Sequence, residues 1–367
     1  MPWQSHSKAH SQLPLSPKDC LHLDVSTEEV PHMDRTFIYD LLYALVAQNG
    51  REAALFGACG PIAHEAFERS LVADAFPELW FELPLLGEPW LDLHALTSYR
   101  DVAGKQATFA GHSGVYDDAL AWFAGQAPGK VRQLALSYDT HAGDVGSPAV
   151  QLLVNGPDPS VPQDFLAVAH RAELQAAYKS FVRAMPAQWY ACYTGVFPGR
   201  DAAGADPWVR VECIVGDQCQ QAYANDISAL AKHLASIGMH NMGSDLVVGV
   251  QELAKLPFPL ELQFNVRPDG TALPALSASV RFQPRDLLDL SRRDVLLRLL
   301  GWMQARGLAD NRCELLPQTV FAKRAQRAGE AVTISCLPAF IKLRWREGHS
   351  PDAKAYLIAQ ANRGRAS

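Results

Sequence analysis

The sequence predicts an α+β fold: a single ten-stranded antiparallel β-barrel of five αββα repeats with helices around the outside. Five pairs of extended runs, each joined by a turn rich in Gly, Pro and Asp, indicate five hairpins. Sequence with helical periodicity follows every pair except the last. No linker rich in Pro, Gly and Ser divides the repeats into separate domains. A closed barrel is therefore expected, because closure pairs the edge strands that open sheets would leave exposed.

The region before the first hairpin has two parts. Residues 1–33 contain four His, four Pro and five Ser without apolar periodicity, a composition typical of a disordered arm. The barrel domain is expected to occupy residues 34–367. Apolar residues at helical spacing predict two helices before the first strand, one around Phe37–Val46 and one around Phe67–Val72.

The strands and helices of the repeats follow from the hydrophobic pattern. The predicted hairpins pair Leu79–Leu86 with Trp90–Leu96, Arg132–Thr140 with Ala149–Asn155, Gln188–Phe197 with Trp208–Val215, Pro259–Val266 with Leu276–Phe282, and Ala331–Trp345 with Ala353–Ala359. Helical spacing of apolar residues predicts the helices between them, at Val115–Gly125, Gln163–Met185, Gln221–Gly238 and Arg285–Gly307.

Composition limits the class of protein. The chain has 367 residues, 33 basic and 39 acidic side chains and a net charge of -6, without a long Lys/Arg block. These values argue against a surface for nucleic acid or an anionic membrane. The chain shows neither a long apolar run nor a secretory signal, so a cytoplasmic protein is expected. Its seven cysteines are scattered without a Cys-x-x-Cys pair, which predicts neither disulfides nor a zinc site. Composition does not indicate the oligomeric state.

The alternation within the strands indicates which side chains face the barrel interior. In Leu260–Val266, Leu260, Leu262 and Phe264 alternate with the polar Glu261 and Gln263. Surrounding helices need the apolar face, so the polar face is expected to line the lumen. The alternative is a half-exposed sheet whose polar face meets water, but the number of helices favours the barrel. The same argument directs Asp92, His94, Arg210, Glu212, Arg281, Lys354 and Tyr356 into the lumen.

Four short segments carry a resemblance to a known family. They are Phe81-Glu82-Leu83-Pro84 on the first strand, Leu136-Ser137-Tyr138-Asp139 on the third, Phe282-Gln283-Pro284 after the eighth, and Lys354-Ala355-Tyr356-Leu357 on the tenth. With the five-fold repeat from Leu79 to Ala359, they resemble the ABBA (αββα, PT-barrel) prenyltransferases. Two branches are similar, the dimethylallyl tryptophan synthases and the cyanobactin-type peptide prenyltransferases.

The resemblance implies an activity and a co-substrate. It implies transfer of a dimethylallyl or geranyl group from a prenyl diphosphate to a small aromatic molecule or a peptide side chain, as in natural-product and peptide (RiPP) biosynthesis. In the matching motifs, Glu82 would be the catalytic carboxylate that holds the nucleophilic ring. Lys354 would bind the diphosphate, and Tyr356 would shield the allyl cation. Tyr190 and Trp90 are further candidates for the cation shield.

The sequence departs from the family pattern at the diphosphate site. The family repeats Lys-x-Tyr or Arg-x-Lys on several even-numbered strands, whereas here only the tenth strand keeps such a motif. A departing diphosphate needs several cations, and the candidates are Arg210, Arg281, Lys342, Arg344 and Lys354. The carboxylates of Asp92, Glu212 and Glu261 would oppose them or require Mg²⁺.

The other candidate lumen residues and functions are less specific. His94 beside Asp92 forms either a proton-transfer pair or a structural hydrogen bond, and Gln263 completes the polar wall. No spacing of His, Cys, Asp or Glu predicts a metal site with certainty. Two other functions stay open: a diverged barrel enzyme that tailors a peptide by hydrolysis or another side-chain change, and a non-catalytic barrel that binds a small molecule or peptide.

Overall fold

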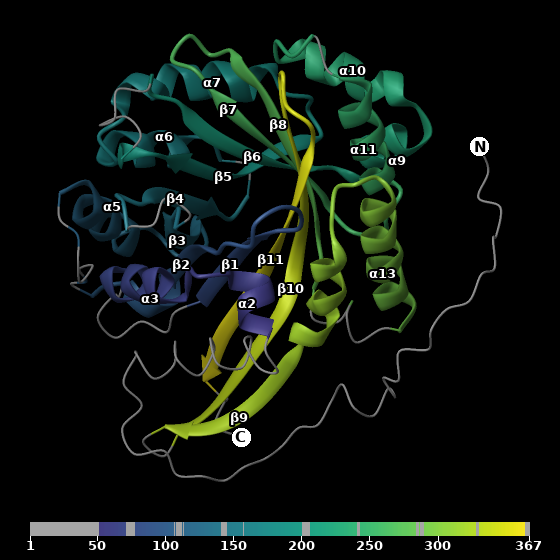
Figure 1. The fold of residues 1–367 in the computed structure, drawn as a ribbon. Helices are drawn as coiled ribbons and strands as arrows, with labels where there is room; N and C mark the ends of the chain where they lie inside the picture. The colour runs from purple at the N-terminus through teal and green to yellow at the C-terminus, as the bar shows by residue number, and fades with distance from the viewer. Residues whose placement is uncertain are drawn as a thin grey trace.

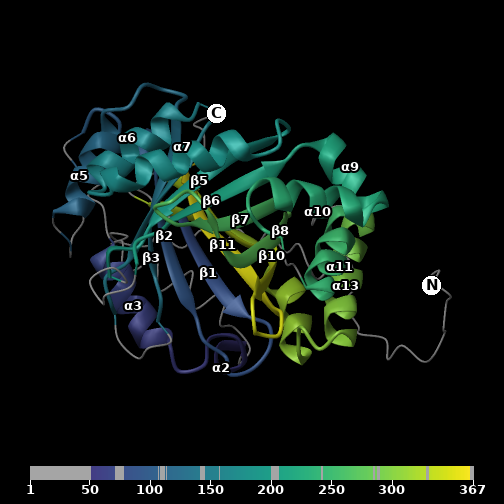
Figure 2. The same ribbon diagram turned by 90° about the horizontal axis from the view of Figure 1, so that it is seen from above.

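The computed structural model describes residues 51–70, 78–105, 107, 112, 114–140, 145–156, 158–199, 206–240, 243–283, 286, 290–327 and 330–363. The predicted arm at residues 1–33 and the predicted helix around Phe37–Val46 lie outside the described residues. Within those that are described, strands form one central sheet and helices lie around it (Figures 1 and 2).

Ten antiparallel strands close into a barrel, which confirms the predicted fold. Each strand pairs with the next along the chain from β1 to β8, β8 then pairs with β10, and β10 with β11. The ring closes because β11 also pairs with β1. The ten strands are β1 (Glu78–Pro84), β2 (Asp92–Ser98), β3 (Val131–Tyr138), β4 (Ala149–Val154), β5 (Trp189–Val196), β6 (Val209–Val215), β7 (Leu260–Val266), β8 (Ala272–Arg281), β10 (Glu330–Arg346) and β11 (Asp352–Arg363).

An eleventh strand, β9 (Phe321–Arg327), was not predicted. It pairs with the first part of β10, and these strands extend beyond the barrel together with the end of β11 (Figure 1). The sequence Phe-Ala-Lys-Arg-Ala-Gln-Arg lacks the β-branched residues that mark a strand. Its extended form accompanies the long β10, whose hydrogen-bonding edge continues past the barrel.

The helices predicted between the hairpins overlap observed ones but differ in continuity, whereas α2 and α4 were not predicted and α3 overlaps the helix predicted around Phe67–Val72 only at its end. The predicted helix at Gln163–Met185 is divided where His170 takes a φ of 56°. The one at Gln221–Gly238 is divided at Asp226, whose side chain accepts the Ser228 N–H as an N-cap. The helices are α2 (Arg51–Phe56), α3 (Gly60–Arg69), α4 (Tyr99–Val102), α5 (Val115–Ala124), α6 (Ser160–Val168), α7 (Gln175–Ala184), α9 (Asp217–Asn225), α10 (Ile227–Ser236), α11 (Ser244–Ala254) and α13 (Leu290–Ala305), with 3-10 turns at Ala172–Leu174 and Asn311–Thr319.

Helix α11 was also missed, since its Val-Val-Gly-Val run weakens the helical signal. It packs on β8 and β10, and a Cβ at Gly249 would lie 3.1 Å from Leu343 Cδ1. Glycine thus permits close approach of this helix to the barrel. In the described part of the chain, no helix is long and apolar enough to cross a membrane. The cysteines described there are free.

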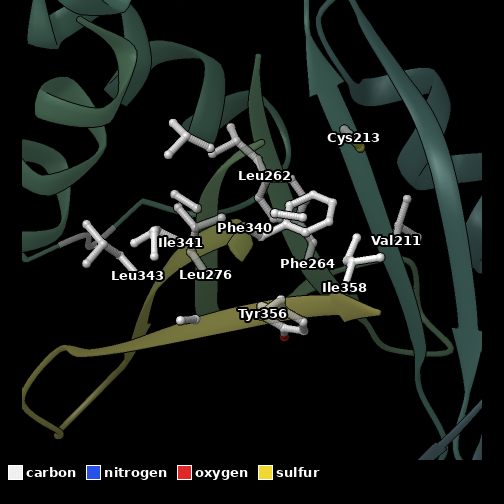
Figure 3. Close-up of a cluster of buried hydrophobic side chains, with 14 of the residues drawn as sticks. Val211, Cys213, Leu262, Phe264, Leu276, Phe340, Ile341, Leu343, Tyr356 and Ile358 are labelled. Atoms are coloured by element: carbon white, nitrogen blue, oxygen red, sulfur yellow. The ribbon is translucent and has the colours of Figure 1, made fainter. Parts of the chain in front are cut away.

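The apolar face of each strand packs outward against the helices. Phe264 is fully buried, with its ring centroid 5.4 Å from that of Phe181 on α7 and 5.8 Å from that of Trp189. Leu262 is buried on the same face (Figure 3). Gln263, between Leu262 and Phe264, lines a cavity inside the barrel. Along the strand, apolar side chains therefore face the helices outside the barrel, and polar side chains face its interior.

Irregularities in strand register change this alternation locally. Among the described strands they lie between Val131 and Gln133 on β3, between Ala191 and Tyr193 on β5, between Phe264 and Val266 on β7, and between Pro338 and Phe340 on β10. A bulge inserts an unpaired residue and re-aims its side chain. Cys192 and Tyr193, although consecutive, therefore line the same cavity, as does Arg132.

We expect that only glycine is tolerated at position 57, where the end of α2 meets the β1–β2 loop. Its φ is +58°, and a Cβ there would lie 2.3 Å from Pro89 O. Gly57→Ala should lower the free energy of unfolding by more than about 2 kcal/mol, because a left-handed backbone and a backbone clash combine. Urea denaturation measures the change.

Gly87→Ala is the matched control. Gly87 has a φ of +83°, but nothing lies within 4 Å of its Cβ position. Gly87→Ala should lower the free energy of unfolding by only about 1 kcal/mol, because the left-handed backbone is its only unfavourable feature. Equal losses in the two variants would show that the contact with Pro89 does not matter.

Candidate active site

The described residues enclose two cavities inside the barrel. The smaller, of about 200 Å³, is lined by Trp80, Phe340 and Tyr356 together with polar side chains, and we name it the aromatic cavity. The larger, of about 540 Å³, contains Trp90, Asp139 and Ser277 in its wall, and we name it the wide cavity. Arg210 and Gln263 line both. The two cavities therefore meet at a polar layer inside the barrel.

The residues predicted for the site divide between these cavities. Glu82 lines neither, but it contacts one residue from each, His94 and Lys354. The aromatic cavity contains His94, Tyr190, Arg210, Glu212, Glu261, Gln263, Arg281, Lys342 and Tyr356. The wide cavity contains Trp90, Asp92, Arg210, Gln263, Arg344 and Lys354.

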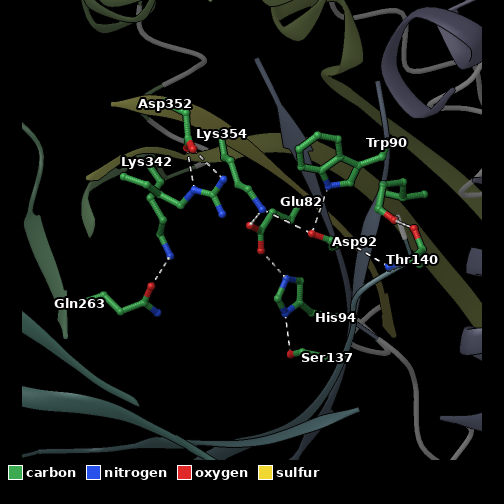
Figure 4. Close-up of polar contacts among 12 residues, drawn as sticks. Glu82, Trp90, Asp92, His94, Ser137, Thr140, Gln263, Lys342, Asp352 and Lys354 are labelled. Atoms are coloured by element: carbon green, nitrogen blue, oxygen red, sulfur yellow. Dashed lines mark hydrogen bonds and ion pairs between the residues drawn. The ribbon is translucent and has the colours of Figure 1, made fainter. Parts of the chain in front are cut away.

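Glu82 is the centre of a buried ionic network (Figure 4). One of its carboxylate oxygens accepts a hydrogen bond from Lys354 Nζ, and the other lies 2.9 Å from His94 Nε2. Burial raises the pKa of Glu82, but the charge of Lys354 and the contact with His94 outweigh it and hold this pKa well below its ordinary value. Glu82 is therefore an anion at neutral pH.

A row of hydrogen bonds continues from Glu82 across three neighbouring strands. His94 on β2 lies directly opposite Ser137 on β3, and its Nδ1 is 2.6 Å from Ser137 Oγ. All three residues are buried. The row Ser137–His94–Glu82 thus fixes the histidine ring through both of its nitrogens (Figure 4).

Asp92 is the second carboxylate beside Lys354. Its Oδ2 lies 3.4 Å from Lys354 Nζ and accepts a hydrogen bond of 3.3 Å from the Trp90 indole. The Thr140 amide donates to its other oxygen at 3.1 Å. Burial raises the pKa of Asp92, although Lys354 acts in the opposite direction. The predicted proton-transfer pair of Asp92 and His94 is linked through two other residues: His94 contacts Glu82, and Lys354 joins Glu82 to Asp92.

The five predicted diphosphate cations do not form one cluster. Lys354 is held by two carboxylates, and Arg344 makes a bidentate pair with Asp352 at 2.6 and 2.8 Å. Both line the wide cavity. Lys342 and Arg281 line the aromatic cavity, and Arg210 lines both.

The charges in the aromatic cavity favour an anion. Arg281 Nη1 lies 3.7 Å from Glu261 Oε1. Burial, followed by the charge of Glu212, raises the pKa of Glu261 to about 8, so this carboxyl is largely protonated at neutral pH. Lys342 Nζ donates to Gln263 Oε1 at 3.3 Å, and Gln263 Nε2 donates to Glu212 Oε2 at 3.2 Å. Burial lowers the pKa of Lys342. Arg281 thus faces a carboxyl that does not cancel its charge.

Aromatic ring faces border these cations. The Lys342 ammonium lies 4.7 Å from the Tyr356 ring centroid, and the Arg281 guanidinium lies 5.2 Å from that of Phe340. Trp80 contacts both rings, with centroid distances of 5.3 Å to Phe340 and 6.5 Å to Tyr356. Such ring faces attract positive charge. The rings of Trp80, Phe340 and Tyr356 form the aromatic cage of this cavity.

Sequence reasoning identified only part of this cage. Tyr356 was predicted, whereas Trp80 and Phe340 were not. Trp80 lies two residues before Glu82, and Phe340 lies two residues before Lys342. Strand alternation therefore places both rings on the lumen face and could have predicted them. The other shield candidates lie elsewhere: Tyr190 is 36% exposed at the cavity rim, and Trp90 lies over Lys354 in the wide cavity.

Arg132 was missed for a different reason. Strict alternation places it on the outer face with Leu134 and Leu136, both fully buried there. The bulge between Val131 and Gln133 turns it into the aromatic cavity.

Among the described residues, the lumen carboxylates do not form a metal cluster by themselves. Across the residues that the structure describes, no group of three or more His, Cys, Asp or Glu side chains is arranged to hold a metal ion. At phosphate-binding sites Mg²⁺ is commonly held by one or two carboxylates together with the phosphates of the substrate. Glu82 and Asp92 are instead joined by Lys354.

The architecture has a counterpart among solved structures. No protein-family model and no curated protein matches the sequence. The apo form of prenyltransferase PriB matches with a TM-score of 0.51 and 13% sequence identity, covering 89% of this chain and 96% of that chain. PriB in a ternary complex with L-tryptophan and dimethylallyl thiolodiphosphate matches with a TM-score of 0.50 over the same shares. The chain folds as an ABBA barrel. At this identity the likeness concerns the fold alone.

The protonated state of Glu261 predicts a pH dependence of stability. Its pKa rises from 4.5 to about 8 on folding, so the native state binds the extra proton between these pH values. As the pH rises through this window, the free energy of unfolding of the wild type should fall relative to that of the Glu261→Gln variant. The difference should change by at most about 1.4 kcal/mol per pH unit. Urea denaturation at intervals from pH 5 to pH 8.5 measures the difference.

Glu252→Gln on α11 is the control, since Glu252 pairs with Lys255 on the surface. Its stability should follow that of the wild type across the same pH range. A Glu261→Gln curve parallel to the wild-type curve would contradict the assignment of the proton to Glu261.

Proposed function

We propose that this chain is a prenyltransferase that moves a dimethylallyl or geranyl group from a prenyl diphosphate to an aromatic or peptide side-chain acceptor inside the barrel. The observation that carries the proposal is the aromatic cage of Trp80, Phe340 and Tyr356, whose faces already border the cations Lys342 and Arg281. An allylic cation formed there meets ring faces, while its leaving group meets positive charge.

The leaving group is the demanding part of this reaction. As the bond from the allylic carbon to the diphosphate oxygen breaks, negative charge develops on the diphosphate. Arg281, Lys342 and Arg210 share the aromatic cavity and would stabilise that charge. Because Glu261 keeps its proton at neutral pH, it carries no negative charge that would oppose the anion.

Glu82 is our candidate for the acceptor end. Its carboxylate is ionised and anchored by Lys354 and His94. It would hold an acceptor ring by an N–H or O–H hydrogen bond and take the proton released after the new bond to carbon forms. A low pKa makes Glu82 a weak base, so its orienting role is the larger one. The L-tryptophan in the PriB complex supports an aromatic acceptor.

The test is a transfer assay with purified protein. Dimethylallyl or geranyl diphosphate is offered with L-tryptophan or a tryptophan-containing peptide, with and without Mg²⁺, and products are identified by mass spectrometry. Glu82→Gln should lower kcat about 100-fold, and Arg281→Gln should raise the KM of the donor. Glu252→Gln serves as the surface control. Absence of donor-dependent product under all these conditions would refute the proposal.

A specific observation favours hydrolysis as a second candidate. The row Ser137–His94–Glu82 joins a hydroxyl, an imidazole and a carboxylate by hydrogen bonds of 2.6 and 2.9 Å. Such a row activates serine as a nucleophile: Oγ attacks a carbonyl carbon, its proton passes through His94 to the leaving group, and water releases the acyl group.

Labelling with a fluorophosphonate separates the two candidates. A hydrolase should form one adduct on Ser137, detected by peptide mass spectrometry and lost in Ser137→Ala. If Ser137 stays unlabelled from pH 6 to pH 9, the row is structural and the hydrolase candidate is wrong.

A further inference from the structure

The two cavities open toward opposite ends of the barrel. Tyr190 and Glu261, at the beginnings of β5 and β7, line the aromatic cavity, as does Arg281 at the end of β8. Asn265, near the end of β7, and Ala275, early in β8, line the wide cavity. Because neighbouring strands are antiparallel, the first set marks one end of the barrel and the second set the other.

An arginine pair stands at the end beside the aromatic cavity. The bulge on β3 brings Arg132 into the wall that already holds Arg281. Burial, followed by the charge of Arg281, lowers the pKa of Arg132, while Glu78 and Glu261 act in the opposite direction. Arg132 is only partly covered and keeps an exposed portion, as expected at a rim. Two guanidinium groups in one wall repel each other, and an anion with several oxygens between them would relieve this repulsion.

The opposite end has a different character. Arg344 is paired with Asp352, and Lys354 with Glu82 and Asp92. These two cations are already neutralised by carboxylates from the protein, while Arg210 and Arg346 also line this cavity. The wide cavity has more than twice the volume of the aromatic one, at about 540 against 200 Å³. Its size and paired charges suit an acceptor better than a multiply charged anion.

We propose that Arg132 and Arg281 form a clamp for the diphosphate of the donor, so that donor and acceptor enter the barrel from opposite ends. This inference rests on the proposed prenyl transfer. The prenyl tail points inward to Trp80, Phe340 and Tyr356. The acceptor comes through the wide cavity to Glu82, which contacts residues of both cavities, His94 and Lys354. The donor and acceptor then meet at the layer between the cavities.

Binding of inorganic diphosphate tests the clamp without requiring catalysis. Isothermal titration should show that Arg132→Gln weakens the binding at least tenfold, because a charge-assisted contact is lost. Arg267→Gln removes the same charge from an exposed position after β7, at the far end, and should bind as the wild type does. Arg132→Lys should recover part of the affinity. No diphosphate binding by the wild type, or equal binding by Arg132→Gln and wild type, would overturn the clamp.

Steady-state kinetics tests the opposite entrances. Ser277, in the wall of the wide cavity, is replaced by tryptophan. Ser277→Trp should raise the acceptor KM more than tenfold with the affinity for diphosphate unchanged, whereas Arg132→Gln should raise the donor KM. Loss of diphosphate binding in Ser277→Trp, with its unfolding transition intact, would mean that both ligands share one entrance.

The outcomes separate this inference from the proposed function. Diphosphate binding that depends on Arg132 without any prenyl transfer would keep the clamp and refute the transferase. Prenyl transfer that is indifferent to Arg132→Gln would keep the transferase and refute the clamp.

Discussion

Closure of the barrel by β11 is the constraint on which the rest of the structure depends. This strand pairs with β10 on one side and with β1 on the other, joining the two ends of the repeat. The pairing sets Tyr356 opposite Glu82 and brings Lys354, 272 positions away in sequence, into contact with that glutamate. Without closure, both cavities would be open sheet faces, and the buried charges would be in water.

Burial within the closed lumen makes each charge depend on its neighbours. A lone ion would be expensive to desolvate, so the acidic groups are either paired or protonated. Glu82 is paired, by Lys354 and His94, and its pKa falls. Glu261 faces Glu212 in the same wall, and its pKa rises to about 8. Two glutamates on lumen strands thus hold different protonation states at neutral pH, which divides the lumen into an end with paired charges and an end that favours an anion.

The amino-acid sequence by itself determined the fold and the sense of its strands. A barrel surrounded by helices must bury one strand face against those helices, so alternation of period two identifies the lumen side chains. That reasoning predicted the ten barrel strands, and it directed Asp92, His94, Glu212 and Lys354 inward, whereas Glu82 was predicted from the resemblance of its motif. Local pattern was sufficient because each of these side chains follows from its own strand. It was insufficient for β9, whose composition lacks strand formers and whose pairing depends on the length of β10.

Only the tertiary structure decided how those side chains combine. Whether Lys354 meets a diphosphate or a carboxylate depends on register between strands that are far apart in the chain, and the register gives it Glu82 and Asp92. Arg132 faces the lumen because of a bulge that alternation cannot reveal. Ionisation depends on the same through-space contacts, since pairing and desolvation are properties of position and not of residue type. Sequence thus selected the residues of the lumen, and three-dimensional register assigned their partners and charges.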